Sequence, residues 1–160
     1  MRQYAIIGLG NFGLRMLEGL SAASDEVLVV DRDADLIEKC KDKAKYAYIA
    51  DVLDEQALRK ILPGSLDVAV VDLGSNIEAA ILVTNTLRES GVGEIIVKAD
   101  SERRGGILEI VGATRVVYPD REAAAQIVPL LVLPGLLSYI PLSPSLVMAE
   151  VKTAAALVGF

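Results

Sequence analysis

Short apolar runs alternate with longer segments of helical periodicity along most of the chain. The strand-like runs are residues 3–8, 26–31, 47–50, 67–73, 94–99 and 115–118, and the helix-like segments are residues 11–22, 33–43, 54–61, 76–90, 101–111 and 120–133. Repeated strand–helix–strand order joins parallel strands through right-handed crossovers. The pattern therefore predicts an α/β fold with a doubly wound parallel sheet of about six strands.

The strand-like runs consist mainly of Val, Ile and Ala, which is typical of strands that are buried on both faces. Hydrophobic residues make up 52% of the chain, but Trp is absent and aromatic residues are only 4%. We therefore expect an aliphatic core covered by helices. In such a sheet, ligands bind at the carboxyl ends of the strands, where the strand order reverses.

The alternation changes near residue 128. Residues 127–152, IVPLLVLPGLLSYIPLSPSLVMAEVK, hold four prolines in a nearly continuous apolar run. Pro129 and Pro134 lack a backbone N–H and are expected to kink or end a helix. This much apolar chain indicates contact with a second subunit, and a tail folded back on its own sheet is the alternative. Residues 149–160 are expected to form a single strand and turn without partners, as in a chain that has been cut short.

Three glycines connect the first predicted strand to the first predicted helix. In YAIIGLGNFGLRML they are Gly8, Gly10 and Gly13. The first permits a tight turn, the second leaves room for a diphosphate beside the backbone, and the third lets the helix pack close to the strand. N–H groups at the start of the helix, around Asn11 and Phe12, have no intrahelical partner, and the helix dipole favours an anion there. The motif predicts nucleotide binding.

Asp31 ends the second predicted strand, about 20 residues beyond the glycines, where a carboxylate accepts hydrogen bonds from ribose hydroxyls. A carboxylate there repels a ribose phosphate, so NAD or an adenosine phosphate is preferred to NADP, although the neighbouring Arg32 weakens that preference. The alternative is that Asp31 only caps the helix predicted over residues 33–43.

Polar residues that follow other strands extend this site. Asp51, with Val52 beside it, either faces an adenine or ribose edge or serves as a turn or cap residue. Ser75 and Asn76 come after Gly74 at the end of the fourth strand, where they either line the nucleotide crevice or cap a helix.

Lys98, near the end of the fifth strand, is costly to bury without a partner. It is either a phosphate partner or paired with a carboxylate such as Asp72 or Asp100. The predicted cofactor-binding residues are thus Gly8, Gly10, Asn11, Phe12, Gly13, Asp31, Arg32, Asp51, Val52, Gly74, Ser75, Asn76 and Lys98.

The charge distribution narrows the range of partners. The net charge is −6, and the Lys and Arg residues are scattered, whereas nucleic-acid binding depends on a basic stripe. Histidine is absent, which removes the commonest general base and metal ligand. We predict no nucleic-acid partner, no catalytic residue and no metal site.

Cysteine usage and the apolar segments bear on the compartment. Cys40 is the single cysteine, so a reducing compartment fits best. Its side chain is either packed on a helix face or a reactive thiol. The sequence displays no signal peptide and no run of the ~20 apolar residues that a membrane span needs.

Five stretches together resemble a known family. YAIIGLGNFG, VLVVDRDADLIE, YIADVLDEQALRK, DVAVVDLGSNIEAAILVTNTLRESGVGEIIVKAD and VGATRVVYPDREAAAQIV resemble the N-terminal lobe of RCK domains, also called KTN or TrkA-N domains. The resemblance implies a Rossmann-like nucleotide-binding domain with a crossover helix over residues 1–137. It also implies that residues 138–160 are the linker and first strand of a truncated C-terminal lobe.

Members of this family are cytosolic regulators of potassium channels and of Trk/Ktr-type potassium transporters. The resemblance therefore implies a regulatory subunit or domain, not an enzyme, that binds NAD(H) or an adenine nucleotide (ADP, AMP or ATP). It implies self-association, as a homodimer or an octameric ring, and a potassium channel or transporter subunit as membrane partner. The location is then cytoplasmic, peripheral at the inner face of the membrane. The alternative is the cofactor-binding half of an NAD-dependent dehydrogenase.

The family motif carries over at the three glycines, which match the diphosphate loop, and at Asp31, the ribose-binding acid. Asp51 matches an acid near the adenosine, and Asn76 and Lys98 match positions in or beside the nucleotide site. The acidic pair Asp120 and Glu122 matches a patch that in some members lies near a subunit interface and a cation.

Two residues depart from the family pattern. Asn11 stands where ATP-responsive members often carry arginine near the terminal phosphate. Asp72 stands where the family usually has a small apolar residue, and there it would repel extra phosphate unless Lys98 or a cation offsets its charge.

Overall fold

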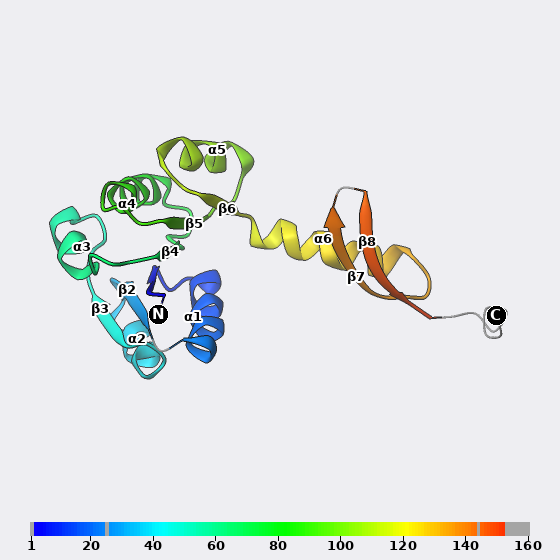
Figure 1. Cartoon of the computed structure of the whole chain (residues 1–160), viewed down its shortest axis with the longest axis horizontal. Helices are drawn as coiled ribbons and strands as arrows, with labels where there is room; N and C mark the ends of the chain where they lie inside the picture. Colours follow the sequence, from blue (N-terminus) through cyan, green and yellow to red (C-terminus); the bar gives the residue numbers. More distant parts are fainter. Residues whose placement is uncertain (1, 25, 144, 153–160) are drawn as a thin grey trace. The chain divides into compact units, whose positions relative to one another are not determined.

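The computed structural model describes residues 2–24, 26–143 and 145–152, and its chain divides into two compact units between Tyr118 and Pro119. In the first unit, strands and helices alternate (Figure 1). The elements are β1 (Tyr4–Ile7), α1 (Asn11–Ala23), β2 (Val27–Asp31), α2 (Ala34–Cys40), the 3-10 turn η1 (Lys41–Lys43), β3 (Tyr46–Ile49), α3 (Glu55–Ile61), β4 (Val68–Val71), α4 (Ile77–Glu89), β5 (Glu94–Lys98), α5 (Glu102–Val111) and β6 (Arg115–Val117).

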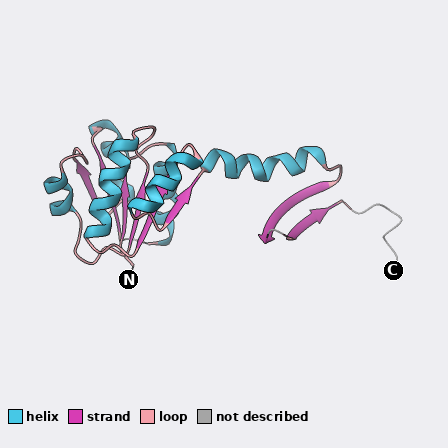
Figure 2. Ribbon diagram, turned by 90° about the horizontal axis from the view of Figure 1, so that it is seen from above, coloured by secondary structure: helices cyan, strands magenta, loops and turns pink. Residues whose placement is uncertain are grey.

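The six strands form one parallel sheet in the order β3-β2-β1-β4-β5-β6. Figure 2 shows helices in front of the strands and behind them, so the sheet is covered on both faces. The chain runs outward from β1 to β3 and then returns to place β4 on the other side of β1. This reversal makes the sheet doubly wound, which confirms the predicted fold class.

Alternate residues of each strand serve different halves of the core. In β1, Ala5 and Ile7 belong to one buried cluster, whereas Ile6 belongs to the cluster on the opposite face. Both clusters are built mainly from Val, Leu, Ile and Ala, as the composition predicts. Cys40 is buried in the second cluster, which confirms the packing role over the reactive one.

Most helices of this unit begin at a side-chain cap. Asp33, Asp54, Asn76 and Ser101 accept hydrogen bonds from backbone N–H groups in the first turns of α2, α3, α4 and α5. Such caps satisfy donors that have no intrahelical partner. At α1 the N-cap residue is Gly10, which has no side chain to offer.

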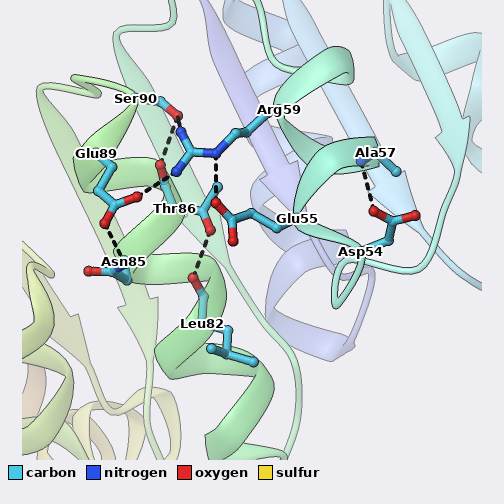
Figure 3. A network of polar contacts seen from close by, with 9 residues as sticks. All are labelled: Asp54, Glu55, Ala57, Arg59, Leu82, Asn85, Thr86, Glu89 and Ser90. Carbon is cyan, nitrogen blue, oxygen red and sulfur yellow. Dashed lines mark hydrogen bonds and ion pairs between the residues drawn. The ribbon is translucent and has the colours of Figure 1, made fainter.

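Arg59 joins α3 to α4 (Figure 3). Its Nε donates to Glu55 at 2.8 Å, its Nη1 donates to the Ser90 hydroxyl at 3.2 Å, and its Nη2 pairs with Glu89. Hydrogen bonds from Asn85, and then from Arg59, hold the pKa of the Glu89 carboxyl below its ordinary value. These groups are exposed, so water and salt screen the network.

The second unit contains α6 (Pro119–Val132) and an antiparallel hairpin of β7 (Leu136–Ser143) and β8 (Leu146–Val151). Pro129 was expected to kink or end a helix; it lies inside α6, so it does not end this one. A proline removes only one donor, and the carbonyl of Pro129 still accepts from the N–H of Leu133 at 3.0 Å. The helix does end ahead of Pro134.

The hairpin also corrects the expectation for the last residues. Ala149 and Glu150 of β8 pair with Tyr139 and Ser138 of β7, so this strand has a partner from its own chain. The pairing was missed because β7 carries Pro141, which does not read as a strand interior. Residues 153–160 lie outside the described residues. The boundary predicted between residues 137 and 138 falls inside β7 and stays a prediction about the family's lobes.

Candidate functional site

A cleft of about 340 Å³ opens at the carboxyl ends of four neighbouring strands. Its lining comes from the segments that follow β1, β2, β3 and β4: Gly8, Leu9, Gly10, Asp31, Arg32, Asp33, Leu36, Ala50, Asp51, Val52, Leu53, Asp72, Leu73, Asn76 and Ala79. The cleft lies at the switch point between β1 and β4, where doubly wound sheets bind ligands. Its volume falls in the range of roughly 300–1,000 Å³ that small-molecule sites occupy.

The structure gathers most of the predicted residues into this cleft. Seven line it directly: Gly8, Gly10, Asp31, Arg32, Asp51, Val52 and Asn76. Gly74, Ser75 and Lys98 line a smaller pocket that shares Asn76 with the cleft. Asn11, Phe12 and Gly13 form the first turn of α1.

Two of the glycines have the roles that the motif predicts. Gly8 has a φ of +90°, and a Cβ on it would lie 2.0 Å from the carbonyl oxygen of Asp72. A Cβ on Gly13 would lie 2.2 Å from the carbonyl oxygen of Gly8. Only glycine therefore allows this tight turn and this close approach of α1 to the loop.

Gly10 makes room for a side chain of the protein itself. A Cβ on Gly10 would lie 2.4 Å from Oδ2 of Asp72. The same oxygen accepts hydrogen bonds from the backbone N–H groups of Phe12 and Gly13, at 3.1 and 3.0 Å. The amides that the motif predicts for a diphosphate are therefore bonded to the Asp72 carboxylate.

Sheet register explains how Asp72 reaches this position. Ile7 and Val71 are paired in the parallel ladder, so Gly8 and Asp72 leave adjacent strands side by side. Asp72 N–H donates to the Ile7 carbonyl at 2.9 Å, which fixes the backbone there. The composition of the loop gives no sign of this contact, because Asp72 and Gly13 are 59 positions apart.

Lys98 pairs with the same carboxylate. Its Nζ lies 3.3 Å from Oδ1 of Asp72, whose side chain is fully buried, while the Lys98 side chain is 26% exposed. Of the two roles left open for Lys98, the structure thus shows the carboxylate partner. Asp100 instead pairs with Arg104.

Asp31, at the end of β2, accepts hydrogen bonds from the loop that follows β1 and from the loop that follows β2. Its Oδ2 accepts from the Leu9 N–H at 2.6 Å, and its Oδ1 accepts from the Asp33 N–H at 2.8 Å. Asp33, not Asp31, is the N-cap of α2. Each carboxylate oxygen has a second lone pair, so both can still accept from a ligand's hydroxyl groups.

Asp51 and Asn76 have structural roles and also line the cleft. Asp51 Oδ1 accepts from the Leu53 N–H at 3.0 Å and closes the turn after β3. Asn76 Oδ1 accepts from the Ala79 N–H at 3.1 Å as the N-cap of α4. For both residues, a turn or cap role and a position in the lining of the cleft were alternatives in the sequence. The structure shows both together.

The sequence reasoning missed the apolar walls of the cleft. Leu9, Leu36, Ala50, Leu53, Leu73 and Ala79 all line it. Most of them lie in loops or at helix ends, where periodicity does not distinguish a site residue from a packing residue. An apolar residue between two predicted elements is the sequence signal that could have found them. Leu53 is an example: it follows β3 in a loop and is 48% exposed at the cleft.

Other candidate chemistry is limited in the part of the chain that the structure describes. No three described His, Cys, Asp or Glu residues are gathered as a metal site would need. Asp120 and Glu122 lie in the first turn of α6. None of the described helices has both the length and the apolar character to cross a membrane.

A doubly wound sheet with a glycine loop at its switch point and an acid at the end of the second strand defines the Rossmann-like class of nucleotide-binding folds. Within that class, the TrkA-N domain model matches residues 4–119. The chain belongs to the TrkA-N domain family, which confirms the resemblance found in the sequence.

Relatives and solved structures agree with this assignment. Ktr system potassium uptake protein C of Bacillus subtilis (strain 168) is 34% identical over 158 residues, which cover 99% of this chain and 72% of that protein. The NAD(P)-binding domain of an exopolyphosphatase-related protein from Archaeoglobus fulgidus is 27% identical, with a TM-score of 0.69 over 83% of this chain and 100% of that chain. The GsuK channel bound to NAD is 19% identical, with a TM-score of 0.61 over 72% of this chain and 21% of that chain, and shows the fold alone.

Proposed function

We propose that this chain is a nucleotide-binding regulatory subunit that controls potassium transport through a membrane channel or transporter. The observation that carries the proposal is the similarity to a Ktr potassium uptake protein over 99% of the chain. That similarity includes the segments around a cleft of ligand size at the switch point of the sheet.

The proposed ligand is NAD(H) or an adenine nucleotide. Its ribose hydroxyls would bond to Asp31, its base would lie between the apolar walls near Val52, and its phosphate side would face the glycine loop. The proposed contacts are the thirteen cofactor-binding residues that the sequence predicts. GsuK, which has the same fold, has been solved with NAD and with ADP, and this supports the choice of ligand class.

The proposed mechanism is a shift between two conformations of an assembled ring. A nucleotide that binds one conformation tenfold more tightly favours it by about 1.4 kcal/mol per site. About eight sites acting together would supply about 11 kcal/mol, more than the ~5.5 kcal/mol that moves a gate from almost closed to almost open. The chain would act in the cytoplasm, at the inner face of the membrane, bound to the potassium-conducting subunit.

Calorimetric titration of the protein with NAD, NADH, ATP, ADP and AMP tests nucleotide binding. Asp31→Ala should weaken binding by about 1–3 kcal/mol, or roughly 5- to 150-fold, because charge-assisted hydrogen bonds to the ribose are lost. Asp42→Ala is the control, since it removes an exposed carboxylate on η1, away from the cleft. Affinity that is unchanged by Asp31→Ala would remove this residue from the site, and no binding of any nucleotide would refute the proposal.

Turnover separates the regulatory role from the dehydrogenase alternative. Mixing the protein with NADH and candidate carbonyl substrates should give no oxidation of NADH. Steady consumption of NADH would favour the dehydrogenase. Potassium flux through a Ktr-type membrane subunit in vesicles, with and without this chain and its nucleotide, then tests regulation directly.

A further inference from the structure

Asp72 serves α1 as a remote cap. The helix has no side-chain cap from Gly10 and no acid in its own first turn. The Asp72 carboxylate, which follows β4, accepts from two of the orphan N–H groups, those of Phe12 and Gly13. A negative charge at this end of the helix is favourable through both the hydrogen bonds and the helix dipole.

This carboxylate is fixed in place. Its side chain is fully buried, and a buried carboxylate persists only with partners of this kind. The amides of Phe12 and Gly13 and the Lys98 ammonium supply them, and Oδ1 also accepts from the Gly74 N–H at 3.5 Å. Among the described residues, no buried side-chain nitrogen or oxygen lacks a hydrogen-bond partner.

A phosphate group at the same amides would have to compete with Asp72. Its oxygen atoms would accept from the same two N–H groups and would stand beside a second negative charge. Near a protein surface, two unit charges about 4 Å apart repel each other by an amount equivalent to roughly a thousandfold in affinity. Lys98 offsets part of this repulsion. The Asp72 carboxylate does not occupy the proposed ribose position, because the backbone partners of Asp31 are the N–H groups of Leu9 and Asp33.

We infer that Asp72 is a built-in anion at the glycine loop and that it sets the ligand class of the cleft. The site then selects an adenine nucleoside or nucleoside monophosphate over ligands that place a diphosphate on α1, such as ADP, ATP and NAD. This inference rests on the proposed function, because it concerns the ligand of the same cleft.

The test compares AMP with ADP by calorimetry. Wild-type protein should bind AMP at least as tightly as ADP. In Asp72→Ala the carboxylate is gone and Lys98 is left to attract phosphate, so the preference for ADP over AMP should rise at least tenfold. Asp72→Asn, which keeps an oxygen to cap α1, should shift the preference in the same direction. Asp67→Ala is the control, because Asp67 bonds to Gln3 at the opposite end of β4.

The outcomes separate this inference from the proposed function. A rise below tenfold in Asp72→Ala, or an equal rise in Asp67→Ala, would overturn the role of Asp72. The wild-type titrations test the inference even if Asp72→Ala does not fold, since ADP bound more tightly than AMP would overturn the inference while nucleotide binding stands. If neither wild type nor Asp72→Asn binds any nucleotide, the proposed function falls as well.

Discussion

The close packing of α1 on the glycine loop can be tested with two alanine substitutions in the same helix. A Cβ on Gly13 would lie 2.2 Å from the backbone oxygen of Gly8, whereas a Cβ on Gly19 has nothing within 4 Å. Gly13 is buried, and Gly19 is exposed. The first substitution therefore adds a clash that the second lacks, while both replace a poor helix former by the best one.

The magnitude follows from these distances. To reach even 3.0 Å, the Gly13 contact must open by 3.0 − 2.2 = 0.8 Å, and a backbone carbonyl cannot rotate away as a side chain can. Overpacking of this kind costs about 1–3 kcal/mol, and we expect the upper end. Each change also gains up to about 1 kcal/mol of helix propensity. Gly19→Ala should thus stabilise the fold by about 1 kcal/mol, and Gly13→Ala should destabilise it by about 2 kcal/mol.

Urea unfolding followed by circular dichroism measures both free energies of unfolding. Because the propensity gain is common to the two variants, their difference isolates the steric cost, about 3 kcal/mol. Nucleotide affinity should also fall in Gly13→Ala alone, since the start of α1 moves away from the cleft. Equal stability of the two variants would refute the argument that Gly13 exists for close packing.

Two further predictions concern the surface. The lowered pKa of Glu89 means that its charged form favours the folded state, so this contribution is complete above its ordinary value of 4.5 and is lost as pH falls through the lower folded pKa. The difference in thermal midpoint between wild type and Glu89→Gln should therefore shrink below pH 4.5, and a constant difference would contradict it. If α6 forms a subunit interface, Leu131→Glu, at a side chain 79% exposed, should shift sedimentation to smaller species without lowering stability. A wild-type protein that sediments as a monomer at micromolar concentration would argue against the assembly.

The arrangement at the glycine loop changes how the motif is interpreted in this chain. Gly8 and Gly13 act as the spacing predicts, but the space beside Gly10 accommodates a carboxylate of the protein. A glycine motif in the right context therefore identifies the turn and the helix start. It does not by itself identify whether a ligand phosphate or a carboxylate of the protein binds the N–H groups at the start of the helix.

Local features were predictable because they depend on neighbours in the chain. Residue spacing and side-chain size predicted the order of the six strands along the chain, the acid at the end of β2 and the aliphatic core. The turn at Gly8 was predictable because only glycine readily adopts such a positive φ. The same information predicted that Lys98 needs a partner, but it left a phosphate and a carboxylate, Asp72 or Asp100, as alternatives; the structure pairs Lys98 with Asp72.

Contacts between distant segments were decided by the tertiary structure. β4 lies beside β1 in a register that pairs Ile7 with Val71, and only this register brings Asp72 to the start of α1. The pairing of β8 with β7 likewise needed a hairpin that the prolines concealed. The physical reason is the same in both cases: a local pattern specifies which elements form, whereas the side chains that meet depend on strand order and register across the whole fold.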